Sequence, residues 1–97
     1  MITMNQVHNA LIKRMGEFRQ GTVLSISYRT GMLGTVNDEL LLEWEDVELK
    51  SKDVVGGYPL FLVRCQELET AGIFADLGAA VAEFQRQCAL WEAQHGA

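Results

Sequence analysis

The residues best suited to chemistry in this chain are carboxylates gathered in one short stretch. Seven of them lie between positions 38 and 53: Asp38, Glu39, Glu43, Glu45, Asp46, Glu48 and Asp53. On a strand, Glu43 and Glu45 would share a face roughly 7 Å apart, a separation relevant to acid–base hydrolysis. A catalytic pair needs unequal environments that separate its two pKa values, whereas charge on alternate residues indicates a solvated strand face. We therefore interpret the stretch as a binding surface.

The histidines and cysteines form no recognisable catalytic or metal-binding motif. His8 and His95 are the only histidines, and no two possible ligands have metal-site spacing within one segment. Cys65 lies in an apolar run and Cys88 within a helical pattern, where no neighbouring cation or helix start favours the thiolate. The sequence predicts no catalytic residue, no metal, no cofactor and no disulfide framework, and hence a protein that is not an enzyme.

The first element that the sequence predicts is a helix over about 4–20. Thr3-x-x-Gln6 has the spacing of a capping box, so the helix should begin near Met4. Apolar residues then recur at helical spacing as far as Phe18, and Gly21 offers a stop.

Strands follow the first helix. Alternation over 22–29 predicts a half-buried strand, Thr30-Gly31 a turn and 32–36 a short return strand. The run 40–44 predicts a third strand, with Leu41 off its core face. Val47 and Leu49 have the parity of Glu43 and Glu45, which we interpret as a bulge near Glu45-Asp46. After a loop over 51–57, the run 60–65 is apolar on both faces and predicts a central strand covered on both sides.

A second helix is predicted over about 72–95, with one apolar stripe that includes Ile73, Phe84 and Trp91. The fold class is therefore α+β: an N-terminal helix, a three- to four-stranded antiparallel sheet and a C-terminal helix packed on the sheet. With 97 residues, 48% of them hydrophobic, positions 1–97 form one domain.

Charge and apolar surface bear on the partners. Residues 1–36 hold four cations against one carboxylate, whereas residues 37–97 carry nearly all the acids, and the net charge is -5. This balance disfavours binding to nucleic acid. The two-sided strand and the apolar residues off the predicted stripes favour a homodimer. No signal peptide or membrane-spanning run is evident, so cytoplasmic residence is expected.

The leading functional hypothesis is a small acidic, non-enzymatic protein-interaction module that binds a basic surface of another protein. Inhibitors, immunity factors and accessory proteins encoded on mobile genetic elements share this profile. The predicted partner-binding residues lie on the acidic strand and loop face: Glu39, Leu41, Glu43, Trp44, Glu45, Asp46 and Glu48. The alternative is a small-molecule-binding protein or enzyme with a pocket between sheet and helices, lined by His8, Tyr28 and Trp91.

One stretch resembles a known family. Residues 20–68 contain Gly31 to Val36 and then Val63-Arg64-Cys65-x-x-Leu68, which is similar to the second motif of Sm-like RNA-binding barrels. Cys65 stands where that family has a glycine. The resemblance implies a second alternative, a small-barrel fold that binds RNA.

Overall fold

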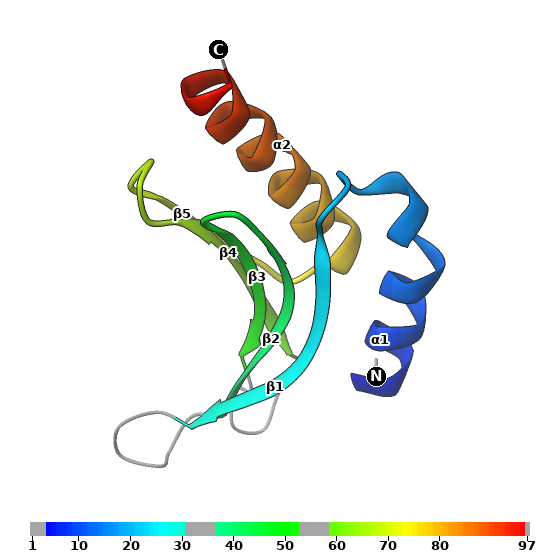
Figure 1. Ribbon diagram of the computed structural model, residues 1–97. Helices are drawn as coiled ribbons and strands as arrows, with labels where there is room; N and C mark the ends of the chain where they lie inside the picture. The colour runs from blue at the N-terminus through cyan, green and yellow to red at the C-terminus, as the bar shows by residue number, and fades with distance from the viewer. Residues whose placement is uncertain (1–3, 31–36, 53–58, 97) are drawn as a thin grey trace.

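A computed structural model describes residues 4–30, 37–52 and 59–96 (Figure 1). It contains two α-helices, a short 3-10 helix and five strands, in the order α1 (Met4–Lys13), η1 (Met15–Glu17), β1 (Val23–Thr30), β2 (Asn37–Trp44), β3 (Val47–Lys52), β4 (Leu60–Cys65), β5 (Thr70–Phe74) and α2 (Leu77–His95). The predicted α+β class is confirmed, with five strands in the antiparallel sheet. The predicted turn and return strand over 30–36 fall largely outside the described residues, as does most of the predicted loop over 51–57.

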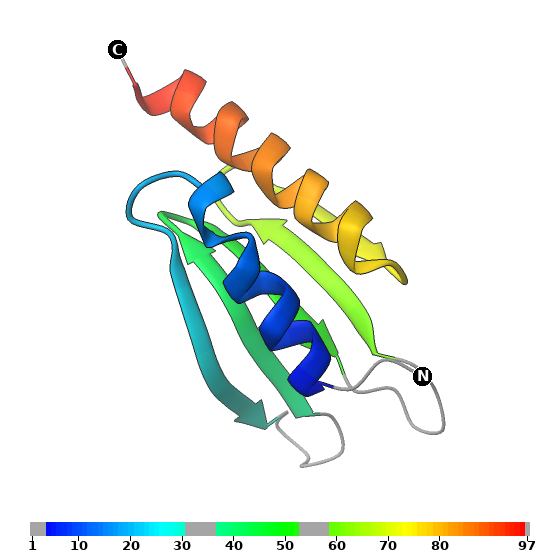
Figure 2. The ribbon, with the colours of Figure 1, turned by 90° about the vertical axis from the view of Figure 1, so that its right-hand side faces the viewer.

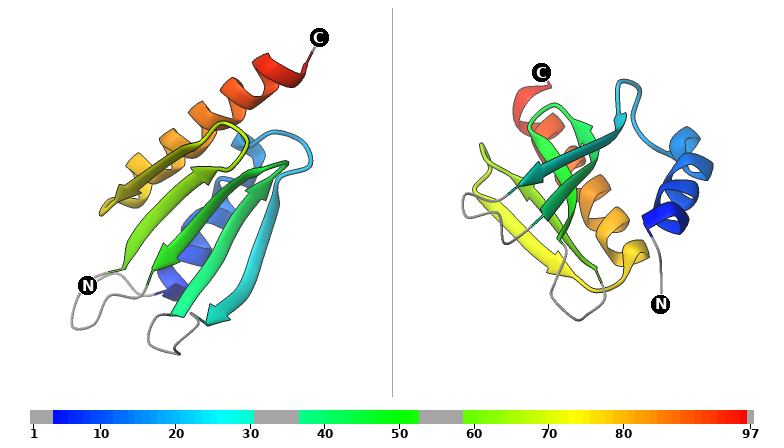
Figure 3. Two further views of the ribbon diagram at one scale, coloured as in Figure 1. Left: turned by 90° about the vertical axis from the view of Figure 1, so that its left-hand side faces the viewer. Right: turned by 90° about the horizontal axis from the view of Figure 1, so that it is seen from below.

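The sheet is an open meander with the strand order β1-β2-β3-β4-β5, and every neighbouring pair is antiparallel. Both helices lie on the same face of this curved sheet, as Figure 2 shows from the helix side and Figure 3 from the strand side. Strands β1 and β5 form opposite edges. The described strands therefore do not close into the small barrel that the resemblance to Sm-like proteins implies.

Cross-strand register divides the side chains into two faces. Leu42, Leu49 and Val63 are partners on the face that the helices cover, and all three are buried. Leu40, Lys50, Leu62 and Ile73 form a row on the opposite face, which we call the open face. Leu40 and Lys50 are buried, but Ile73, at the β5 end of the row, is 62% exposed. Among the described residues the helices cover only one side of β4, contrary to the prediction that both sides are covered.

The predicted bulge near Glu45-Asp46 is wrong. These two residues are the turn of the β2–β3 hairpin, in which Trp44 pairs with Val47. Because paired residues face the same way, this two-residue reversal produces the change of parity seen in the sequence. The register shift in β2 lies between Leu40 and Leu42, and Leu41, expected off the core face, is fully buried in the core.

The first helix is shorter than predicted, because α1 ends at Lys13 and residues 15–17 form the 3-10 turn η1. Gly16 lies within that turn, and glycine is about 1 kcal/mol less favourable than alanine inside a helix. Phe18 is then extended and buried, with its ring edge-on to Phe84 of α2 at a centroid distance of 6.0 Å. The aromatic contact brings the end of the α1 segment onto α2.

The second helix begins five residues later than predicted. Residues 70–74 form the edge strand β5, and the carboxylate of Asp76 caps α2 by accepting a hydrogen bond from the Ala79 N–H at 2.9 Å. Ile73, assigned from the sequence to the helix stripe, instead projects from β5. The apolar side of α2 packs over β3, β4 and β5.

The cysteines behave as the sequence predicts for small core residues. Cys65 and Cys88 are both buried and free. Burial raises the pKa of Cys88 to about 12 and also raises the pKa of Cys65. Within the described residues, neither α1 nor α2 has the apolar length that a bilayer-spanning helix needs.

Candidate functional site

The seven predicted partner-binding residues do not form one surface. Glu39 and Leu41 are buried beneath the helices, and Glu43 and Glu48 are cross-strand partners on the open face. The remaining three follow one another at the tip of the β2–β3 hairpin: Trp44, Glu45 and Asp46. Only the hairpin tip and the open face are placed where another protein could reach them.

Glu39 attaches α1 to the sheet. Its Oε1 atom lies 2.6 Å from Nε2 of His8, and its side chain is 2% exposed. The other carboxylate oxygen, Oε2, is buried with no hydrogen-bond partner among the described residues. This carboxylate therefore has a structural role in the arrangement shown, and neither it nor Leu41 is accessible to a protein partner.

Glu48 is largely compensated by cations of its own chain. Its Oε2 atom lies 3.4 Å from Nζ of Lys50 and 3.3 Å from Nε of Arg64. Glu43 stands opposite Glu48 and is half-buried. The open face therefore presents little unbalanced negative charge around Glu48.

Among the described residues, acids gather at two neighbouring hairpin turns. Asp46 of the β2–β3 turn accepts a hydrogen bond from the backbone N–H of Glu67 in the β4–β5 turn, at 2.7 Å. This bond ties together the two tips, whose acids we call the acidic turn surface: Glu45, Asp46, Glu67 and Glu69. Glu45 and Glu69 are exposed, and neither turn contains Lys or Arg.

Backbone geometry distinguishes Glu45 and Glu69 from the other described residues that are not glycine. Their φ angles are 52° and 54°, and they are the only described residues other than glycine with positive φ. The left-handed conformation costs an L-residue roughly 1–2 kcal/mol, a cost that glycine avoids. Both turns therefore carry a glutamate where the backbone favours glycine.

A cluster of rings supports the acidic turn surface from the α2 side. Trp44 and Trp91 meet edge to face at 5.4 Å, and His95 stacks on Trp91 at 4.1 Å. The Trp91 Nε1–H donates to Glu67 Oε2 at 2.8 Å, and His95 Nε2 lies 2.8 Å from the same oxygen. Glu67 is thereby held in place, while Glu45 and Glu69 extend from the turns.

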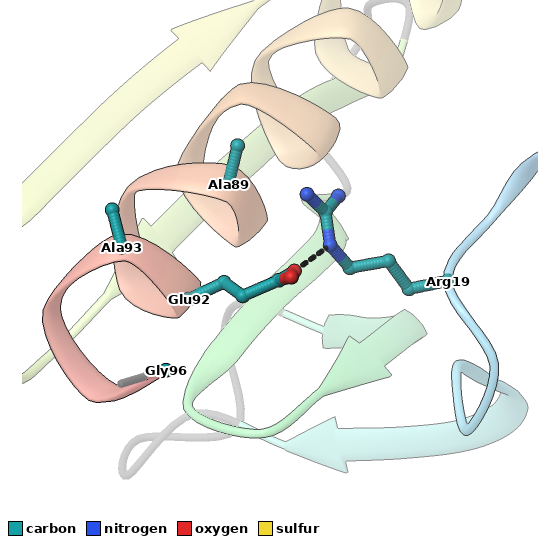
Figure 4. Close-up of a pocket in the computed structure, with 5 residues that line it drawn as sticks. All are labelled: Arg19, Ala89, Glu92, Ala93 and Gly96. Carbon is teal, nitrogen blue, oxygen red and sulfur yellow. Dashed lines mark hydrogen bonds and ion pairs between the residues drawn. The ribbon is translucent and has the colours of Figure 1, made fainter.

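A surface pocket of about 360 Å³ lies near the C-terminal end of α2 (Figure 4). It is lined by Arg19, Ala89, Glu92, Ala93 and Gly96. Figure 4 shows Arg19 and Glu92 facing each other across it, with Arg19 Nε donating to Glu92 Oε2 at 2.5 Å. The pocket therefore contains neither of the two described side chains proposed to line a ligand site, His8 and Trp91. The third residue, Tyr28, has a side chain that the structure does not describe.

The described residues proposed to line a ligand pocket do not lie together. His8 contacts Glu39 near one end of β2, whereas Trp91 contacts Trp44 at its other end. Within the described ranges, no three His, Cys, Asp or Glu side chains are grouped so that they could hold a metal ion.

Glu67 and Glu69 are not among the residues predicted from the sequence to bind a partner. Both belong to the segment Gln66-Glu67-Leu68-Glu69-Thr70, which follows directly after the apolar strand 60–65. If this polar segment is interpreted as a hairpin turn, both acids lie at the same end of the strands as the Glu45-Asp46 turn. Comparison of the chain with models of protein families, with curated proteins and with solved structures finds no match.

Proposed function

We propose that this chain is a small non-enzymatic protein-interaction module that binds a basic surface of another protein through the acidic turn surface. The observation that supports the proposal is the presence of glutamate at both left-handed turn positions, Glu45 and Glu69. Local strain at such positions is retained where the side chain has a use that outweighs the strain. Two exposed carboxylates on adjacent, tied turns provide such a use.

The chemistry of recognition is charge complementarity. Carboxylates at the edge of an interface steer a basic partner toward it, so they raise the association rate and make binding sensitive to salt. Trp44 is half-buried next to the turn and provides an apolar neighbour, and the ring cluster keeps the surface rigid. We therefore keep Trp44, Glu45 and Asp46 as partner-binding residues and add Glu67 and Glu69.

The proposal covers the class of partner and not the process. An acidic module of this kind fits an inhibitor, an immunity factor or an accessory protein of a mobile element, acting in the cytoplasm. The acidic surface repels phosphate backbones, so the proposed partner is a protein and not a nucleic acid.

The test is affinity capture of partners from host lysate with the tagged chain and with its Glu45→Gln/Glu69→Gln variant, at low and high salt and with nuclease. Each removed charge should weaken binding by about two- to fivefold, mainly through the association rate, while the free energy of unfolding stays nearly constant. Glu17→Gln is the matched control, because Glu17 is an exposed acid that pairs with Arg14 in another part of the chain.

The capture experiment has three distinguishable outcomes. A captured protein that is lost with the double variant but retained with Glu17→Gln supports the proposal. A captured protein that both variants retain equally would move the binding surface away from these turns. Loss of capture after nuclease treatment would indicate a nucleic-acid tether instead of a protein contact.

A further inference from the structure

The two edges of the sheet differ in their protection against pairing with another strand. Edge strands of monomeric proteins are usually blocked by charged side chains, proline or bulges. The β1 edge has a register shift between Leu24 and Ser27 and contains Arg29. The β5 edge, Thr70-Ala71-Gly72-Ile73-Phe74, has no charged residue, no proline and no register shift against β4. The β5 edge is therefore unprotected.

The structure also holds β5 in place and leaves one of its faces bare. Helix α2 packs on one side of β5, where the Thr70 hydroxyl donates to Gln87 Oε1 at 2.8 Å. On the open face Ala71 is exposed and Ile73, the partner of Leu62 on β4, is 62% exposed. Figure 3 shows β5 at the margin of the sheet with the open face uncovered by either helix.

We propose that β5 pairs antiparallel with β5 of a second copy of this chain, about a twofold axis at Gly72, so that the two sheets become continuous. This inference goes beyond the proposed function, because β5 and its outer edge are distinct from the acidic turn surface. The proposed occupant is a second copy, because the edge pairs with itself in register and without opposed like charges.

Register fixes the axis. In an antiparallel pair, opposing residues face the same side of the sheet, so the twofold axis must pass beside a residue. An axis at Gly72 pairs all five residues of β5 and places Ala71 opposite Ile73 of the second copy. An axis one residue earlier would bring the left-handed Glu69 into the ladder, and one residue later would bring in Asp76, which caps α2.

Charge permits two acidic chains to meet at this edge. With the axis at Gly72, Glu69 stands opposite Ala75 of the second copy and Asp76 opposite its Leu68, so no like charges oppose each other. A partner that binds through ion pairs would find no charged side chain on β5. A second copy gains backbone hydrogen bonds and contacts of Ile73 with Ala71.

The size of the contact sets the expected strength. A ladder of five residues per chain buries less than the roughly 800 Å² per partner found in stable complexes. We therefore expect a dimer that dissociates on dilution and forms in the micromolar range or above.

The first experiment is sedimentation over a wide concentration range. The unmodified chain should shift from the monomer mass toward twice that mass as concentration rises, and Ile73→Lys should hold it at the monomer mass, because lysine on an edge blocks pairing. Leu90→Lys is the matched control: Leu90 is 41% exposed on α2 and lies off β5. A chain that stays monomeric throughout would overturn the proposal.

The second experiment tests the register and does not depend on a blocking variant. Ala71→Cys and Ile73→Cys chains, mixed and mildly oxidised, should form a disulfide with each other within the roughly 4.4–6.8 Å that Cα atoms of a disulfide span. Each variant alone should form little, because identical positions lie about two residues out of register. Cys65 and Cys88 are buried and should not react. The β5 interface would be rejected if Ile73→Lys left the dimer intact. It would also be rejected if each cysteine variant cross-linked to itself as readily as position 71 cross-links to position 73.

The two proposals fail separately. Glu45→Gln/Glu69→Gln should leave the cross-link unchanged, and Ile73→Lys should leave capture of a basic partner unchanged if the turns alone bind it. Loss of the cross-link with intact capture contradicts only the dimer, and the reverse result contradicts only the proposed function.

Discussion

The two helices cover the same face of the sheet but are held to it by different means. The buried residues of α2 are mostly apolar, Ala80, Val81, Phe84 and Cys88, together with Gln87. The amide of Gln87 accepts from Thr70 and donates to Glu83 Oε2 at 2.8 Å, so this buried polar group is satisfied. Helix α1 buries Val7 and Leu11 and adds the contact of His8 with Glu39, whose second oxygen lacks a described partner.

The two modes of attachment contribute different amounts of stability. Apolar burial contributes about 25 cal/mol per Å², whereas a buried carboxylate with an unsatisfied oxygen carries a desolvation cost that offsets much of its bonding. We expect α2 and the strands on which it packs, β3 to β5, to be the most stable part of the molecule, and we call this part the α2 unit. Helix α1 should detach at a lower free energy.

The largest effect is expected in the α2 unit. Phe84→Ala should lower the free energy of unfolding by about 3–5 kcal/mol, because it removes a ring that is 1% exposed and contacts Phe18. Urea unfolding measures the change. Leu90→Ala, on the exposed side of the same helix, should change stability by less than about 0.5 kcal/mol. Similar losses for the two variants would contradict the assignment of the core.

A smaller loss is expected at α1. His8→Ala leaves Glu39 buried without its partner and should cost about 2–3 kcal/mol. Hydrogen exchange should show faster exchange in α1 than in α2. The double variant His8→Leu/Glu39→Leu should recover much of the loss, because it removes both polar groups. A His8→Ala chain of unchanged stability would show that the contact contributes nothing to α1 attachment.

Sequence patterns predicted the fold class and most elements, because apolar periodicity reports which faces are buried. They misplaced boundaries where one residue outweighs the pattern. Gly16 ends the first helix early, and the Asp76 cap starts the second late. The parity change at Val47 fits a bulge or a turn equally well from sequence, and only the pairing of Trp44 with Val47 decides between them.

The candidate site was less predictable. Charge density in the sequence identified the stretch that contains Glu45 and Asp46, but it also included Glu39, which tertiary contact with His8 buries. Glu67 and Glu69 come from a distant segment, and the tertiary hydrogen bond from the Glu67 N–H to Asp46 joins the two turns. The positive φ of Glu45 and Glu69 cannot be read from residue type, because glutamate rarely adopts it.

Alkaline pH should weaken the α2 unit selectively. Burial raises the pKa of Cys88 to about 12 from an ordinary value of 9.0, so above pH 9 the folded chain keeps a proton that the unfolded chain loses. The contribution of the protonated Cys88 thiol to the free energy of unfolding is fully present below about pH 9. It is lost as the pH rises toward 12, by on the order of 1 kcal/mol per pH unit at most. Urea midpoints at pH 8 and about 10 measure this loss. A Cys88→Ala chain should show a shallower decline, and an equal decline would assign it to other groups.

The smallest effects concern the turns and test whether the two units unfold together. Glu45→Gly and Glu69→Gly each relieve a left-handed glutamate and should raise the free energy of unfolding by about 0.5–1 kcal/mol. The Glu45 turn joins β2 to the α2 unit at β3, whereas the Glu69 turn lies within that unit. Equal gains in urea unfolding indicate one cooperative transition. A gain at Glu69 alone would show that β2 separates from β3 before the α2 unit unfolds, because strain that has already been released cannot affect the last unfolding step. A loss of stability on either change would show that the glutamate side chain, and not the backbone, determines the turn.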